Sequence, residues 1–145
     1  MAIWDWALAV YARPGVPEAC LKLQDLHGQN TSLLLWAAYA GAQDEAILAR
    51  ACAIARTWDQ TALLPLRAVR RGLKPPLPPV DDRAREGLRD DVKAAELRAE
   101  RVLLETLELL GTGGADAVSA LRAASAAWGP RAPDAALVEL ARALG

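Results

Sequence analysis

Apolar residues recur at intervals of three and four along most of the chain, and proline, glycine and capping residues divide this pattern into segments. Such spacing predicts α-helices, because it places the apolar side chains on one helix face. Asn30 is a residue type that caps helix starts, and Gly28 and Gly41 are of the type that ends helices. We therefore predict helices over residues 3–12, 17–28, 31–40, 45–57, 60–74, 81–111, 116–127 and 134–144, the fifth interrupted by Pro65.

The pattern is broken by the sequence KPPLPPVDD, in which four of the five positions 75–79 are proline. Proline favours a stiff, extended connection with few backbone donors. We therefore predict a single helical domain over residues 1–145, made of an N-terminal core (1–73), a proline-rich spacer (74–80) and a long helix with short C-terminal helices (81–145). The long helix carries a seam of seven-residue period that should face another helix: Leu88, Val92, Ala95, Ala99, Val102, Thr106 and Leu109.

The composition agrees with an all-α fold. The chain is rich in alanine and leucine and contains no phenylalanine. Helices use alanine and leucine readily, whereas sheets favour β-branched and aromatic residues. We expect a compact helical bundle of about six to eight helices, with one long helix after the proline-rich spacer.

The charge of the chain argues against several partners. The formal net charge is -1 and the pI is about 5.8, so no positive field is present to hold nucleic acid or an anionic membrane surface. Its longest uncharged run, residues 26–43, is too polar to cross a bilayer. Cys20 and Cys52 lie in apolar helical segments, and the N-terminus does not have the pattern of a signal peptide. We expect a cytoplasmic protein with reduced thiols.

The only histidine lies in the segment CLKLQDLHGQNTSLLLWAAYAG, residues 20–41. At 100° per residue, Gln24 and His27 share the side of Cys20, and we predict that both are buried or line a cavity. Asp25 lies on an opposite stripe that should face water, together with Glu18, Lys22 and Gln29. The next helix is apolar in every direction and should be central in the fold.

Two interpretations of these polar residues stay open. Gln24 and His27 either form core hydrogen bonds that tie the second helix to the first, or contact something that the protein binds in a pocket between the first three helices. The candidate binding residues of such a pocket, including its aromatic walls, are Gln24, His27, Asn30, Trp4, Trp36, Tyr39, Asp25 and Cys20.

No catalytic residue, cofactor motif or metal site is identified. One histidine and two distant cysteines cannot form a zinc site of the usual kind. Cys20 and His27 are separated by about 10 Å of helix, too far for a nucleophile pair. The acidic pairs at 81–82 and 90–91 lack the spacing of a magnesium diphosphate site, and GTGGAD lacks the residues of a phosphate-binding loop. A basic run (Arg67, Arg70, Arg71 and Lys74) is either a solvated face or a contact for an acidic partner or anion.

The first 60 or so residues contain a Trp-x-x-Ala element, a Tyr-x-x-Pro-Gly-Val turn, the sequence Cys-Leu-x-Leu-Gln-Asp-x-x-Gly-x-Asn and a Leu-Leu-x-x-aromatic helix. In these motifs the chain resembles a family of short proteobacterial proteins of unknown function. The resemblance implies a bacterial cytoplasmic protein with a variable C-terminal half and supplies no activity. The motif residues are Trp4, Cys20, Gln24, Asp25, Gly28 and Asn30.

Two functional hypotheses follow. The leading hypothesis is a non-enzymatic interaction or adaptor module that binds a protein partner or a second copy through its long helix or its tryptophan-rich half. The alternative is a small-molecule binding protein or enzyme with its pocket between the first three helices, using Gln24, His27 and Asn30.

Overall fold

The computed structural model describes residues 1–145 and contains only helices and connecting loops, which confirms the all-α prediction. None of the helices combines the length and apolar character needed to cross a membrane. The α-helices are α1 (Ile3–Tyr11), α2 (Val16–His27), α3 (Thr31–Ala40), α4 (Glu45–Trp58), α5 (Leu64–Gly72), α6 (Asp82–Glu108), α7 (Ala117–Trp128) and α8 (Asp134–Leu144), and a π-helical turn, η1 (Asp59–Leu63), joins α4 to α5.

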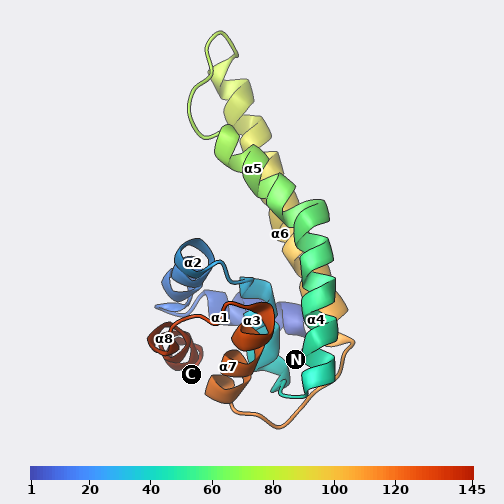
Figure 1. The fold of residues 1–145 in the computed structure, drawn as a ribbon. Helices are drawn as coiled ribbons and strands as arrows, with labels where there is room; N and C mark the ends of the chain where they lie inside the picture. The colour runs from blue at the N-terminus through green and yellow to red at the C-terminus, as the bar shows by residue number, and fades with distance from the viewer.

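Helix α3 lies at the centre of a globular body, where α1, α4, α6 and α7 pack around it (Figure 1). Leu33, Leu34 and Trp36 are completely buried on different sides of this helix, so its predicted central position is confirmed. Helix α8 closes the body by packing on α2 and α7. One continuous core of 31 apolar residues draws on every helix except α5.

The ends of α3 are fixed as the sequence predicted. Asn30 Oδ1 accepts a hydrogen bond from the Leu33 backbone N–H at 2.9 Å, and Gly41 ends the helix with a φ of 63°. A side chain at Gly41 would lie 2.9 Å from the carbonyl oxygens of Gly113 and Ala115. The backbone N–H of Gly113 in turn donates to the carbonyl of Ala40 at 2.7 Å. The GTGGAD segment is therefore held against the end of α3.

Residues 64–98, which we call the arm, extend away from the body as a helical hairpin (Figure 1). Helix α5 packs on the first half of α6, and the proline-rich segment 74–80 forms the tip. The predicted interruption of the fifth helix at Pro65 is not found. Pro65 lies in the first turn of α5, directly after the wide turn η1, where its missing N–H costs little.

The buried face of α6 differs from the predicted seam. Of the seven seam residues only Ala99 is buried, whereas Leu88 and Leu109 are 52% and 86% exposed. The residues of α6 that are buried are Arg85, Glu96, Ala99, Leu103, Leu104 and Leu107. The prediction is wrong because it assumed one neighbour along the whole helix. In the structure α6 runs beside α5 in the arm and then enters the body, where it packs on α1, α3, α4 and η1 (Figure 1).

Candidate functional site

Of the two predicted alternatives, burial or the lining of a cavity, neither Gln24 nor His27 shows full burial, but Gln24 lines the small polar niche described below. Both side chains are half-buried: Gln24 Nε2 donates to Asp25 Oδ1 at 3.3 Å, and the His27 side chain forms no hydrogen bond. Helix α2 packs mainly on α8 and buries Val16, Ala19, Cys20 and Leu23. Gln24 and His27 therefore lie at the edge of this contact, and they form no core bond between α2 and α1.

Gln29, predicted to face water, is instead 4% exposed. The helical angle does not apply to it, because α2 ends at His27 and Gly28 turns the chain with a φ of 61°. Gln29 Nε2 donates to the Pro130 carbonyl at 2.8 Å, while its Oε1 is buried and accepts no hydrogen bond. The neighbouring Asn30 caps α3 and also donates through Nδ2 to Asp59 Oδ1 at 3.0 Å.

Asp25 and Cys20 lie apart from one another. Asp25 is exposed, as predicted, and forms an ion pair with Arg71 of the arm at 3.4 Å. Cys20 is buried, and burial together with the negative charge of Glu100 raises the pKa of its thiol to about 12. Cys20 is therefore a protonated core residue at neutral pH, which is unsuited to nucleophilic chemistry.

The aromatic candidates do not form one wall. Trp36 is fully buried in the core, and its Nε1 has no hydrogen-bond partner. The Tyr39 hydroxyl lies within hydrogen-bond distance of both the Met1 carbonyl and Glu108 Oε2, and its ring packs at a tilt of 54° against Trp6, with centroids 5.2 Å apart. Trp4 lines two cavities beside α6, whereas Trp36 borders a separate small pocket near the GTGGAD segment.

A small polar niche lies where α2, α3, η1, α5 and α6 meet, at the base of the arm. Its volume of about 20 Å³ is enough for one water molecule or one small polar group. Burial raises the pKa of Asp59 here, although the hydrogen bond from Asn30 partly opposes the shift. The niche is lined by Gln24, Gln29, Asn30, Thr31, Ser32, Asp59, Leu63, Arg67 and Glu100.

Glu100 is the most unusual group of the niche. It forms no hydrogen bond or ion pair, although the neighbouring Glu96 binds Arg70 at 2.6 Å and Arg67 at 3.5 Å. Burial, reinforced by the charge of Glu96, raises the pKa of Glu100 to about 7 against the opposing effect of the two arginines. The carboxyl group is therefore poised between its neutral and charged forms at physiological pH.

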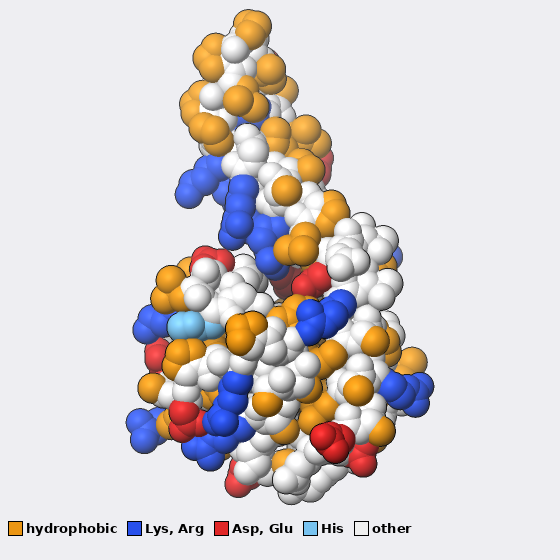
Figure 2. All heavy atoms as spheres, viewed as in Figure 1, with side chains coloured by type: hydrophobic (Ala, Val, Ile, Leu, Met, Phe, Trp, Pro, Cys, Tyr) orange, Lys and Arg blue, Asp and Glu red, His pale blue; other side chains and the backbone are white.

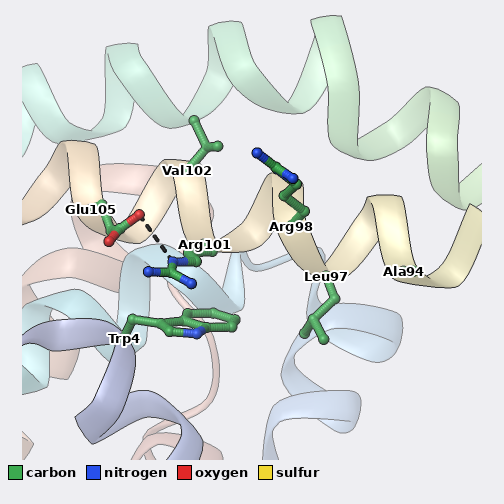
Figure 3. Close-up of a pocket in the computed structure, with 7 residues that line it drawn as sticks. All are labelled: Trp4, Ala94, Leu97, Arg98, Arg101, Val102 and Glu105. Atoms are coloured by element: carbon green, nitrogen blue, oxygen red, sulfur yellow. Dashed lines mark hydrogen bonds and ion pairs between the residues drawn. The ribbon is translucent and has the colours of Figure 1, made fainter.

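Glu100, Thr31 and Ser32 also line an apolar groove of about 120 Å³ between α1, α3 and α6. This amphipathic groove is completed by Trp4, Ala7, Leu8, Tyr11, Leu35, Leu97 and Leu104. Figure 3 shows a separate pocket that shares Trp4 and Leu97 with this groove. There the Arg101 guanidinium lies over the Trp4 ring, 5.6 Å from the centroid, and Leu97 points to the same side of α6. Arg101 also pairs with Glu105 at 3.2 Å.

The predicted basic run on α5 is mostly satisfied within the chain. Arg67 and Arg70 pair with Glu96, and Arg71 pairs with Asp25. Only Lys74, at the tip, has no ion pair among the four. The run therefore mainly joins α5 to α6 within the arm, and only the Arg71–Asp25 pair connects the arm to the body. Arg67 Nε remains buried without a hydrogen bond.

The arm itself carries an exposed apolar surface. Side chains of this kind cover its outer part in Figure 2, and basic side chains gather along one flank near its base. The tip adds four prolines between Lys74 and Val80. The large hydrophobic residues of the arm that are exposed are Leu64, Val69, Leu77, Val80, Leu88 and Leu97.

Sequence reasoning missed Asp59, Glu96 and Glu100 as site residues. Asp59 lies between two predicted helices, and the two glutamates lie in a helix dense in charge. The available signal was their spacing, because positions 96, 100 and 103 follow one another on one face of α6. No group of three or more His, Cys, Asp and Glu side chains is arranged to hold a metal ion.

Comparison with known proteins identifies a family. A family described as "Protein of unknown function (DUF2390)" matches residues 2–107, which include the arm and both sides of the polar niche. The match extends well beyond the first 60 residues on which the sequence resemblance rested. Neither a curated protein nor a solved structure matches the chain. With almost three quarters of its length matched, the chain belongs to the DUF2390 family of proteins of unknown function.

Proposed function

We propose that this protein is a non-enzymatic interaction module that binds a different protein through its arm. The observation that carries the proposal is that the arm exposes apolar side chains while having almost no apolar core of its own. Helix α5 contains no buried residue, and the first half of α6 buries only Arg85 and Glu96. A partner surface would supply the apolar contact that this two-helix layer lacks.

Polar contacts support the arm in place of a core. Arg85 is buried and donates to the carbonyls of Leu73 and Lys74, which joins the two helices near the tip. Arg70 of α5 reaches Glu96 of α6 at 2.6 Å. These bonds hold the hairpin in one shape before any partner binds, which reduces the entropy lost on binding.

The charge of the arm favours a partner with an apolar patch bordered by acidic residues. Residues 64–98 contain nine Lys and Arg against six Asp and Glu, whereas the remaining residues carry an acidic excess. The cationic residues without an ion pair include Lys74 and Lys93. Such complementarity speeds association and rejects basic surfaces. The two free, buried cysteines fit a reducing compartment, so we place this interaction in the cytoplasm.

Photo-crosslinking from the arm tests this function. A photoreactive amino acid replaces Leu88 on the arm or, as a matched control, Leu26 on α2, which is 73% exposed. In host cells we expect one protein to be crosslinked through position 88 and not through position 26. Equal labelling at both positions, no adduct, or an adduct made of two copies of this chain would overturn the proposal.

Paired substitutions sharpen the same test. Val69→Glu with Leu88→Glu should reduce capture of the crosslinked protein at least tenfold, because a carboxylate would be buried against an acidic border. Leu26→Glu is the control. Both variants should unfold at the same denaturant concentration as the parent, since the three side chains are exposed. Undiminished capture by the double variant would contradict a role of the arm.

A further inference from the structure

We propose that the junction of the amphipathic groove and the polar niche binds a small primary amine with a compact apolar group, and that Glu100 is the carboxylate that receives the ammonium. This binding site is independent of the interaction proposed for the arm. The argument rests on the shared lining of two cavities, on unsatisfied polar atoms and on the available volume.

Three residues, Thr31, Ser32 and Glu100, line both the niche and the groove. On one side of them the lining is mainly apolar, with Trp4, Leu35 and other hydrophobic side chains. On the other side it is polar. A ligand that spans the junction therefore needs an apolar part and a polar part within a few bonds of each other.

The unsatisfied atoms indicate what the polar part must be. Gln29 is 4% exposed, and its buried Oε1 accepts no hydrogen bond. Glu100 is half-buried and forms no hydrogen bond or ion pair within the chain. A buried polar group without a partner costs about 1 to 3 kcal/mol, which a ligand donor would recover. Three carboxylates (Asp59, Glu96 and Glu100) are accompanied by two arginines (Arg67 and Arg70), both bound to Glu96.

An ammonium group satisfies these conditions better than the alternatives. Its three donors can reach a carboxylate and neighbouring hydroxyl or amide oxygens, and its charge offsets the local acidic excess. A ligand carboxylate would bring a further negative charge beside Glu100 and Asp59, and Arg67 is already held by Glu96. The buried Arg67 Nε, which has no hydrogen bond, is the one donor that favours an anion.

The volume limits the apolar part. The groove holds about 120 Å³, somewhat less than a cavity known to accept a benzene ring, which encloses about 150 Å³. A branched chain of about five carbons fits this space, and the niche has room for an ammonium or for one water. The probe is therefore 3-methylbutylamine, with 3-methylbutanol and 3-methylbutanoate as its neutral and anionic counterparts.

Titration calorimetry and two-dimensional NMR on the full chain test the site. At pH 8 we expect 3-methylbutylamine, added to about 10 mM, to bind and to shift the indole N–H signal of Trp4, which lines the groove. The alcohol should bind at least tenfold more weakly and the carboxylate not at all. Absence of amine binding, or preferential binding of the carboxylate, would overturn the proposal.

Variants locate the site. Glu100→Gln should weaken amine binding at least tenfold and leave the alcohol unaffected. Asp91→Asn, which changes an exposed carboxylate of the same helix that lines neither cavity, should bind as the parent does. Melting curves confirm that both variants fold. Equal affinity of the parent and Glu100→Gln for the amine would refute the assignment of Glu100.

A proton-release measurement provides a second readout. The charged and titratable groups near Glu100 are Glu96, Arg67 and Arg70 across α5 and α6, Asp59 of η1, and Tyr11 and Cys20 of α1 and α2. Since the pKa of Glu100 is about 7, binding of a cation near pH 7 should release a proton from it. Calorimetry in two buffers of different ionisation enthalpy should detect that proton for the parent and not for Glu100→Gln. The same proton release in the variant would contradict the proposal.

Discussion

The body and the arm of this protein are stabilised in different ways, although α6 runs through both. In the body, α6 buries Leu103, Leu104 and Leu107 in the continuous apolar core. In the arm, the same helix buries only Arg85 and Glu96, and their bonds to α5 are polar. Apolar burial contributes stability over a large area without strict geometry, whereas each polar bond depends on a single partner.

This difference predicts which region can change shape. Regions with few buried apolar contacts open locally at lower free energy than the core. The arm is therefore expected to open independently of the body, while the niche at its base is fixed by both. The following experiments test this division, beginning with the largest expected effect.

The largest expected difference is in the free energy of unfolding that is lost when a leucine of the core or of the arm is replaced by alanine. Leu34→Ala in α3 removes a completely buried side chain and should lower the free energy of unfolding by about 2 to 5 kcal/mol. Leu88→Ala in the arm removes a half-exposed side chain and should change it by less than about 0.5 kcal/mol. Urea denaturation followed by circular dichroism measures both. Comparable losses would show that the arm folds as part of the core.

Neutralising Glu100 should stabilise the protein at alkaline pH. Its pKa is raised from 4.5 to about 7, so between these values the folded state keeps a proton that the unfolded chain has released. The free energy of unfolding of the parent should therefore fall as the pH rises through this window. At pH 8, Glu100→Gln should be more stable than the parent by up to about 3 kcal/mol, and at pH 4 the two should agree.

Denaturant titrations at the two pH values measure this effect. Glu105→Gln is the matched control, because its exposed ion pair with Arg101 contributes little. A constant difference between Glu100→Gln and the parent at both pH values would mean that the carboxyl group keeps its ordinary pKa. The niche would then be a hydrated part of the surface.

The helices could be predicted from the sequence because their signals are local. Asn30, Gly28 and Gly41 act within one or two turns, and the structure places the ends of α2 and α3 where these residues indicate. The central position of α3 was also predictable, since a helix that is apolar in every direction has to be covered on all sides.

The site could not be predicted in the same way, because it depends on which helices meet. A helical angle places Gln29 on the surface only if α2 continues, and it ends two residues earlier. The partial burial of Glu100 follows from the neighbours of α6 at that turn, which change along the helix. The prediction of the α6 seam is wrong for the same reason, because it assumed one seven-residue repeat along a helix that has different neighbours in the arm and in the body.

Removing the Arg85 side chain should open the arm without unfolding the body. Arg85→Ala leaves the carbonyls of Leu73 and Lys74 without their charged donor, a loss of about 1.5 to 3 kcal/mol. Amide hydrogen exchange near the tip, for example at Val80, should accelerate by about ten- to a hundredfold. Arg83→Ala, which changes an exposed neighbour, is the control. Acceleration throughout the body would contradict independent opening.

The smallest expected effect comes from removing one helix-capping hydrogen bond in the body or in the arm. Asp44 caps α4 in the body and Asp81 caps α6 at the tip of the arm, where their carboxylates accept backbone N–H groups at 3.0 and 2.8 Å. Replacement by alanine should cost about 1 kcal/mol of helix stability at either site. Asp44→Ala should lower the free energy of global unfolding by this amount. Asp81→Ala should leave the free energy of global unfolding unchanged and accelerate amide exchange only near the tip. The reason is that the arm should already be open when the core unfolds, so the lost cap weakens only the arm. A shift in the global denaturation midpoint for Asp81→Ala equal to that for Asp44→Ala would mean that the hairpin and the body unfold as one unit, despite the absence of a shared apolar core in α5.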